Sequence, residues 1–172
     1  IEALAKDNGL TKEETIEQMT RQYDGYHFHP YAEGVYNPFS VLNAFYKKEF
    51  GNYWFQTGTP TFLVKSLQKA DYDLRTLMDG VEAPAVNFTE YRAEANNPIP
   101  LIYQSGYLTV KDYDKRFQIY TLGFPNDEVR YGFLNFLIPF YTPVTDDKRG
   151  FYIGQFIQEL ENGEVDAFMQ RF

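Results

Sequence analysis

The sequence predicts a mainly α fold with small β-hairpins, in the α+β class. Signals for helix starts recur along the chain, at Thr11, Asn37-Pro38 and Asn97-Pro98. Two short runs between residues 107 and 122 alternate apolar and polar side chains, as the strands of a hairpin do. Aromatic residues make up 19% of the 172 residues, so relatively few side chains can fill a core.

The N-terminal part of the chain is expected to be helical. Thr11 and Glu14 have the spacing of a capping box, so a helix should begin there. The turn signal Asp24-Gly25 should end this helix. Residues 26–28 and 34–36 are then expected to pair as a small hairpin.

Two further helices are expected before residue 80. The first starts at Asn37-Pro38 and ends near Gly51, and the second starts at Thr59-Pro60. Helical spacing predicts that the first of them buries the apolar stripe Phe39, Leu42, Tyr46 and Phe50.

The central stretch is the most informative part of the sequence. A short helix from Asn97 leads into strands at 107–111 and 117–122, joined by a polar turn. Residues 81–88 are expected to add an extended segment beside them. A long apolar helix capped by Asn126 follows. This order is compatible with a winged-helix module and also with a generic α+β core hairpin, and the pattern leaves both open.

We expect three regions along the chain. A helical region covers 1–80, the winged-helix-like module covers 81–145, and a helical pair covers 146–172. The pair is predicted from apolar residues at helical spacing in 153–160 and 165–172.

The charge of the chain limits its binding partners. The net charge is −8, which argues against a broad nucleic-acid surface, because such affinity depends on many Lys and Arg contacts. A local basic patch is formed in sequence by Lys111, Lys115 and Arg116 around the hairpin turn. The alternative interpretation is a solvated turn, since Asp112 and Asp114 lie among these cations.

Several site types are excluded by residue content. The chain has no cysteine, which removes disulfides and thiolate metal sites. His27 and His29 lack the spacing of a zinc motif, so no metal site is expected. No apolar run reaches the length of a membrane span and no signal peptide is visible, so we expect a cytoplasmic protein with no membrane partner. The first residue is Ile1 rather than Met, and we expect the chain to be a piece of a longer protein.

Five strings in the chain are more specific than generic core sequence. The strings are YDGYHF (23–28), GVYNPFSVLNAF (34–45), NYWFQTGTPTFLVKSL (52–67), LIYQSGYLTV (101–110) and YTLGFPNDEVRYGF (120–133). Together, and in this order, they closely resemble the predicted AAA-ATPase-like family of Bacteroides-type bacteria, over residues 10 to 142.

The resemblance implies a specific place for this chain in a larger protein. In that family a P-loop ATPase core is followed by a helical lid and winged-helix region, and often by a PD-(D/E)xK nuclease-like domain. This sequence has no GxxxxGK[ST] motif, no Walker B strand and no convincing nuclease-like carboxylate motif. We therefore expect no catalytic residue and no cofactor within the chain. ATP and Mg²⁺ are implied for the parent protein, and the expected partners are its ATPase core and nuclease-like domain.

Few residues stand out as candidates for a binding site. Tyr23 and Asp24 are candidates for contacting nucleotide or the ATPase core, and Arg21 is the nearest basic candidate for a phosphate contact. The alternative is that Asp24 belongs to a helix-stop turn with Tyr rings packed around it. His27 has no Ser, Cys or carboxylate partner placed by the sequence, so a free-standing enzyme is the less favoured hypothesis.

Overall fold

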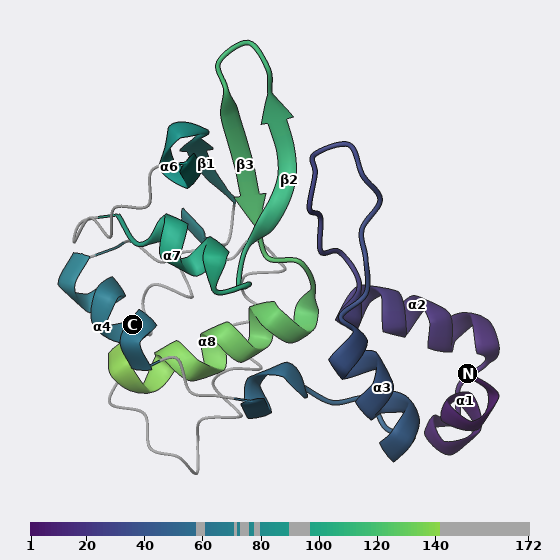
Figure 1. Ribbon diagram of the computed structural model, residues 1–172. Coiled ribbons are helices and arrows are strands. Elements are labelled where there is room, and N and C mark those ends of the chain that lie inside the picture. The colour runs from purple at the N-terminus through teal and green to yellow at the C-terminus, as the bar shows by residue number, and fades with distance from the viewer. Residues whose placement is uncertain (58–60, 71, 73–75, 78–79, 90–96, 142–172) are drawn as a thin grey trace, which may run out of the picture. The chain divides into compact units, whose positions relative to one another are not determined.

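The computed structural model describes residues 1–57, 61–70, 72, 76–77, 80–89 and 97–141. These residues form helices and one three-stranded antiparallel sheet (Figure 1), so the predicted mainly α, α+β class is confirmed. The chain divides into two compact units, Ile1–Arg130 and Tyr131–Phe172. The boundaries predicted at 80 and 145 stay predictions, and the helices predicted at 153–160 and 165–172 lie outside the described residues.

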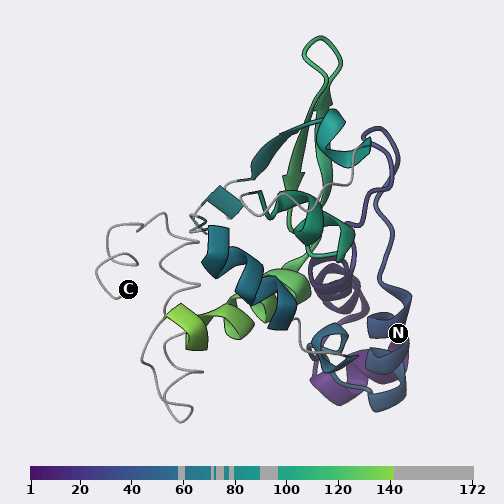
Figure 2. The ribbon, with the colours of Figure 1, turned by 60° about the vertical axis from the view of Figure 1, so that its left-hand side comes forward.

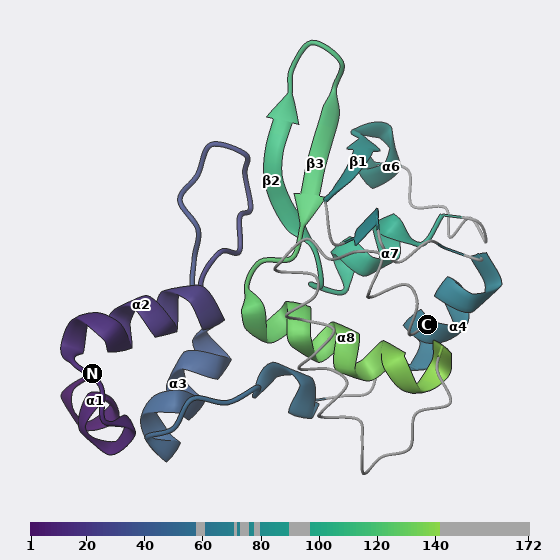
Figure 3. The ribbon, with the colours of Figure 1, turned by 180° about the vertical axis from the view of Figure 1, so that it is seen from behind.

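Three helices make up the N-terminal part of the first unit (Figure 3). They are α1 (Glu2–Asn8), α2 (Lys12–Tyr23) and α3 (Pro38–Lys47). The predicted capping box of α2 is confirmed, because Glu14 N–H donates to Thr11 Oγ1 at 3.2 Å and Thr11 N–H donates to the Glu14 carboxylate at 2.8 Å. The predicted cap of α3 is also present, since Asn37 Oδ1 accepts from Phe39 N–H at 3.1 Å.

The core of the three helices is centred on Tyr23. Its side chain is fully buried among apolar residues. The ring stacks on Phe50 at 6.3 Å between centroids, and the hydroxyl both donates to Gly51 O and accepts from Gly51 N–H, each at 3.0 Å. The same side chain therefore fills the core and satisfies the backbone after α3. The core consists of Leu4, Met19, Tyr23, Ala44 and Tyr53, with Val41 and Phe50 packed against it.

The orientation of α3 differs from the prediction. Ser40 and Ala44 face the core and are fully buried, whereas Leu42 is 67% exposed and Tyr46 is 87% exposed. Helical spacing shows which residues share a face, but it does not show which neighbour covers that face. The small residues Ser40 and Ala44 allow close approach of α3 to the core. The apolar stripe therefore points outward, and of its predicted residues Phe50 packs against the core.

A long loop connects α2 to α3 and carries the small hairpin that the sequence predicts. Its pairing is limited to a bridge between Tyr26 and Val35, which exchange backbone hydrogen bonds of 3.2 and 2.9 Å. Figures 1 and 3 show this loop beside strand β2. The 3₁₀ helix η1 (Trp54–Thr57) and helix α4 (Thr61–Ala70) follow α3.

The sheet has the order β1-β3-β2, with every pair antiparallel. The strands are β1 (Val81–Pro84), β2 (Thr109–Asp114) and β3 (Ile119–Gly123). The extended segment predicted at 81–88 is therefore confirmed over 81–84, where it pairs with β3, but it is wrong for residues 86–88, which are helical. Between β1 and β2 the chain forms α6 (Val86–Thr89) and α7 (Ile99–Gln104). The last described element is α8 (Asp127–Tyr141). Its predicted cap is present, because Asn126 Oδ1 accepts from Val129 N–H at 3.1 Å.

The β2–β3 hairpin extends beyond β1, as Figure 2 shows. Its turn lies further along the chain than predicted, because β2 continues to Asp114. Asp114 Oδ1 accepts from the backbone N–H groups of Arg116 and Phe117 at 2.8 and 3.0 Å, which stabilises the turn. Gln118 adopts a positive φ of 54° before β3 begins.

Candidate functional site

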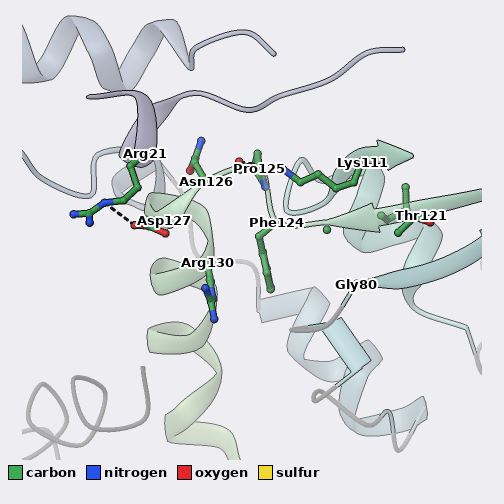
Figure 4. A pocket seen from close by; sticks show the side chains of 11 residues that line it. Arg21, Gly80, Lys111, Thr121, Phe124, Pro125, Asn126, Asp127 and Arg130 are labelled. Carbon is green, nitrogen blue, oxygen red and sulfur yellow. Dashed lines mark hydrogen bonds and ion pairs between the residues drawn. The ribbon is translucent and has the colours of Figure 1, made fainter. Parts of the chain in front are cut away.

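A pocket of about 430 Å³ lies where the sheet meets the first turn of α8 (Figure 4). Three cationic side chains line it, and they come from separate elements: Arg21 from α2, Lys111 from β2 and Arg130 from α8. The remaining lining residues are Gly80, Thr121, Leu122, Gly123, Phe124, Pro125, Asn126 and Asp127. We refer to it as the basic pocket.

A β-bulge places Lys111 in the basic pocket. Val110 pairs with Leu122 and Asp112 pairs with Thr121, so Lys111 is the extra residue on β2. A bulge redirects a side chain relative to the regular alternation of a strand. The stem of Lys111 crosses Gly123, where an added Cβ would lie 3.2 Å from Lys111 Cγ. This glycine therefore leaves room for the lysine stem.

The ammonium group of Lys111 has few partners for a cation. It donates to Pro125 O over 3.4 Å, a long hydrogen bond. Partial burial lowers the pKa of Lys111, and the nearby Asp24 carboxylate opposes this shift. Lys111 is an exposed residue, and its side chain lines the pocket. Burial removes part of the water that would stabilise the charged ammonium. An anion bound in this pocket would stabilise that charge in place of water.

The other two cations of the pocket differ from each other. Arg21 forms an ion pair with Asp127, with 3.2 Å between Nε and Oδ2, as Figure 4 shows. The Arg21 side chain is 73% exposed, so this pair adds little to stability. Within the described residues no ion pair involves Arg130, and its guanidinium retains its donors for an external anion. With three cations and one carboxylate in its lining, the pocket is suited to an anionic group.

Tyr23 and Asp24, which the sequence offers as candidates for a nucleotide contact, both make contacts that stabilise the fold. Tyr23 is buried in the helical core. Asp24 Oδ1 accepts from Gly25 N–H at 2.7 Å, and Asp24 O accepts from Asn126 Nδ2 at 2.9 Å. An added Cβ on Gly25 would lie 2.2 Å from Pro125 O, so only glycine fits this contact. The Asp24-Gly25 turn therefore anchors α2 to the segment before α8.

His27 belongs to the same anchoring segment. His27 N–H donates to Thr109 Oγ1 at 2.7 Å, and Thr109 Oγ1 donates to His27 O at 3.0 Å. The imidazole Nδ1 is 3.0 Å from Ala32 O, so the ring completes the loop rather than meeting a carboxylate. Residues 24–27 and 109 together form what we call the clasp between the N-terminal helices and the sheet.

The three predicted nucleic-acid contacts do not form one surface. Lys111 lies in the basic pocket, whereas Lys115 and Arg116 lie in the hairpin turn. Lys115 Nζ lies 4.7 Å from the centroid of the Tyr31 ring, and the Arg116 guanidinium lies 5.0 Å from that of Phe117. Both turn cations are exposed, so they remain accessible to a partner.

A buried carboxylate is the main feature that the sequence does not indicate. Glu128 is fully buried, and its Oε1 accepts from Tyr53 N–H at 2.5 Å and from Trp54 N–H at 3.0 Å. An acidic residue in the first turn of a helix normally interacts with the helix dipole from a solvated position. The sequence carries no local signal for this burial, because the partners lie 75 and 74 residues away.

Burial raises the pKa of the Glu128 carboxyl, while Ser40 and the N–H groups of Trp54 and Tyr53 oppose the rise. Ser40 is close enough to act on this carboxyl electrostatically, but no hydrogen bond of acceptable geometry joins the two side chains. Among the described residues, Glu128 Oε2, Ser40 Oγ and the Tyr26 hydroxyl are buried without a hydrogen-bond partner. Glu128 therefore joins α8 to the start of η1 and to the residue before it, at a cost in desolvation.

In the part of the chain that the structure describes, no group of three His, Cys, Asp or Glu side chains is arranged to hold a metal ion. Within the same ranges, none of the helices combines the length and the apolar character needed to cross a bilayer.

Comparison with known proteins gives a relative of much greater length. The chain is 33% identical over 129 residues to an uncharacterized protein in the vnfD 5′ region of Azotobacter chroococcum mcd 1. The match covers 74% of this chain and 24% of that protein, so the chain spans about a quarter of the relative's length. No family model matches the chain. No solved structure matches it either.

Proposed function

We propose that this chain is the non-catalytic lid and winged-helix region of a longer AAA-type ATPase-like protein. In this role it couples the nucleotide state of an ATPase core to a C-terminal nuclease-like domain. ATP and Mg²⁺ bind to the core, and the residues of this chain transmit the change in nucleotide state to the C-terminal domain. The five sequence strings that resemble the family supply the starting point for the proposal.

The observation that carries the proposal is the order of elements around the sheet. Helix α4 precedes β1, two short helices separate β1 from β2, and β3 lies between β1 and β2. A winged-helix module has this order, in which the β2–β3 hairpin is the wing and α7 occupies the position of the second helix of a helix-turn-helix. The agreement in order and pairing supports the winged-helix assignment over a generic core hairpin.

The clasp supports a coupling role. Through Gly25, His27 and Thr109, the end of α2 is fixed both to β2 and to the segment before α8. A displacement of the helical lid would therefore act directly on the sheet. Coupling between two sites requires a structural element whose conformation both sites affect. In this proposal the clasp is that element.

The basic pocket supports a contact with an anionic group of the core. Arg21 belongs to the helical lid, and Lys111 and Arg130 belong to the sheet and to α8. A nucleotide phosphate or a carboxylate of the core would bridge these parts of the first unit, because each supplies a cation. Occupation of the pocket would then stiffen the same junction that the clasp forms.

The length of the relative agrees with a larger parent protein. About three-quarters of the relative lies outside the matched region. That length leaves room for an ATPase core and a further domain.

Isothermal calorimetry tests this proposal with ATP and Mg²⁺. We expect no ATP binding by the 172-residue chain and micromolar binding by the full-length protein. Tight ATP binding or hydrolysis by the 172-residue chain alone would refute the non-catalytic assignment.

The second candidate function is a nucleic-acid-binding winged helix. It is favoured by the exposed turn of the hairpin, where Lys115 and Arg116 lie next to the exposed ring of Phe117. Gel shifts at low and high salt, on the parent and on a variant with Lys111, Lys115 and Arg116 changed to Glu, test it. An unshifted duplex at low salt, or an equal shift by the variant, removes this candidate.

A further inference from the structure

The outer side of α3 is apolar and exposed. Phe39 is 44% exposed, Leu42 is 67% exposed and Tyr46 is 87% exposed. Their spacing of three and four residues places them on one side of the helix. Phe45, 37% exposed, widens this side. The inner side of α3 is already in contact with the core through Ser40 and Ala44, so the outer side is a second face.

The apolar side continues into the loop before α3. Val35 is 44% exposed and Tyr36 is 38% exposed. Tyr36 and Pro38 line a groove of about 370 Å³, together with residues that include Trp54 and Gly106. We call the outer side of α3 together with these loop residues the α3 surface. Its members are Val35, Tyr36, Phe39, Leu42, Phe45 and Tyr46.

The composition of the α3 surface indicates the chemistry of its partner. None of its six side chains carries a charge. A phosphate backbone or an acidic peptide would find no cation among them, whereas an apolar face would gain by covering them. Exposed large side chains scattered singly are ordinary on proteins, but a contiguous helical stripe of them marks an interaction site.

We propose that the α3 surface is covered by an apolar face of the same, longer polypeptide, in the part that lies outside these 172 residues. The choice of occupant rests on the proposed function. It is supported by the relative, of which about three-quarters lies outside the region that this chain matches. The spacing of Phe39, Leu42 and Tyr46 is that of a helix that buries its stripe, and none of the residues that the structure describes covers that stripe.

Thiol labelling tests the proposal, because the chain has no cysteine of its own. Leu42→Cys places a thiol on the α3 surface, and Glu17→Cys on the exposed part of α2 is the matched control. Both are made in the 172-residue chain and in a cysteine-free form of the full-length protein. We expect Leu42→Cys to react with a maleimide at the control rate in the short chain, and at least tenfold more slowly in the full-length protein.

Three outcomes would overturn the proposal. Equal labelling of both thiols in the full-length protein would show that nothing covers the surface. Slow labelling of Leu42→Cys in the dilute short chain would show that the 172 residues cover it themselves. Labelling that slows as the concentration of the short chain rises would assign the surface to a second copy.

The calorimetry described above separates the two proposals. A full-length protein that protects Leu42→Cys without binding ATP removes the ATPase function and keeps the covered surface. A full-length protein that binds ATP and leaves Leu42→Cys open removes the covered surface alone. Leu42→Asp supplies a second readout. We expect it to raise the proteolysis rate of the full-length protein, and to leave the urea midpoint of the short chain unchanged because residue 42 is exposed there.

Discussion

The backbone N–H of Tyr53 donates to Oε1 of Glu128 across 75 residues of sequence, at 2.5 Å. The same oxygen accepts from Trp54 N–H. One buried carboxylate therefore satisfies two backbone donors in the segment between α3 and α4. This arrangement ties the start of α8 to the helical part of the first unit, and it makes stability sensitive to the chemistry of a single side chain.

Replacement of Glu128 should separate its hydrogen bonding from its charge. We expect Glu128→Ala to lower the free energy of unfolding by about 2–4 kcal/mol, because two buried N–H groups lose their acceptor and a cavity remains. Glu128→Gln keeps an oxygen acceptor and removes the buried charge, so its effect should stay within about 1 kcal/mol. Urea unfolding at pH 7 measures both. Equal losses for the two variants would show that the charge, and not the acceptor, is what the segment requires.

The free energy of unfolding should depend on pH through the titration of Glu128. Because burial raises its folded-state pKa above the ordinary 4.5, its contribution is fully present below 4.5 and is lost as pH rises through the folded pKa. The parent protein should therefore gain stability relative to Glu128→Gln as pH falls from 7 toward 4.5. Glu14 is the control of opposite sign, because its hydrogen bonds with Thr11 lower its pKa. If the difference in unfolding free energy between the parent and Glu128→Gln did not change with pH, the raised pKa would be contradicted.

Gly25 should tolerate no side chain. It has φ of 101°, and an added Cβ would lie 2.2 Å from Pro125 O. Gly9 is the matched control, since it has φ of 67° and no atom within 4 Å of an added Cβ. We expect Gly9→Ala to cost about 1–2 kcal/mol from backbone strain alone, and Gly25→Ala to cost about 1–3 kcal/mol beyond that. Thermal unfolding of the two variants checks this, and equal losses would mean that the turn does not press against Pro125.

Thr109 should hold the loop between α2 and α3 against the sheet. Thr109→Val keeps the shape of the side chain and removes both hydrogen bonds to His27, so we expect a loss of about 1–3 kcal/mol. Thr109→Ser keeps the hydroxyl and is the control. Hydrogen exchange at the His27 amide should become at least tenfold faster in Thr109→Val. An unchanged rate would show that the clasp does not depend on this hydroxyl.

Local signals predicted much of the fold. The capping box at Thr11, the cap at Asn37 and the cap at Asn126 all form as the sequence indicates, because a cap depends on residues within one turn. The hairpin also follows from a pattern of alternation, and the extended segment expected at 81–88 supplies the third strand over 81–84. The polar run predicts the hairpin turn too early in the chain, since β2 continues to Asp114, whose side chain accepts hydrogen bonds from the turn.

Features that depend on distant partners were not predictable. The burial of Glu128 depends on N–H groups 75 residues away, and the position of Lys111 depends on a bulge in the pairing of β2 with β3. Helical spacing correctly places Phe39, Leu42 and Tyr46 on one face of α3, but it predicts the wrong environment for that face. A sequence pattern gives the face, and only the neighbours decide whether that face is covered.

The most direct test of the proposed coupling role is hydrogen–deuterium exchange on the full-length protein with and without ATP and Mg²⁺. We predict that nucleotide changes the exchange of the amides of Tyr26, His27 and Val35, which lie in the loop that the clasp fixes to the sheet. Nucleotide that binds to the protein but leaves exchange unchanged throughout residues 1–141 would contradict the account.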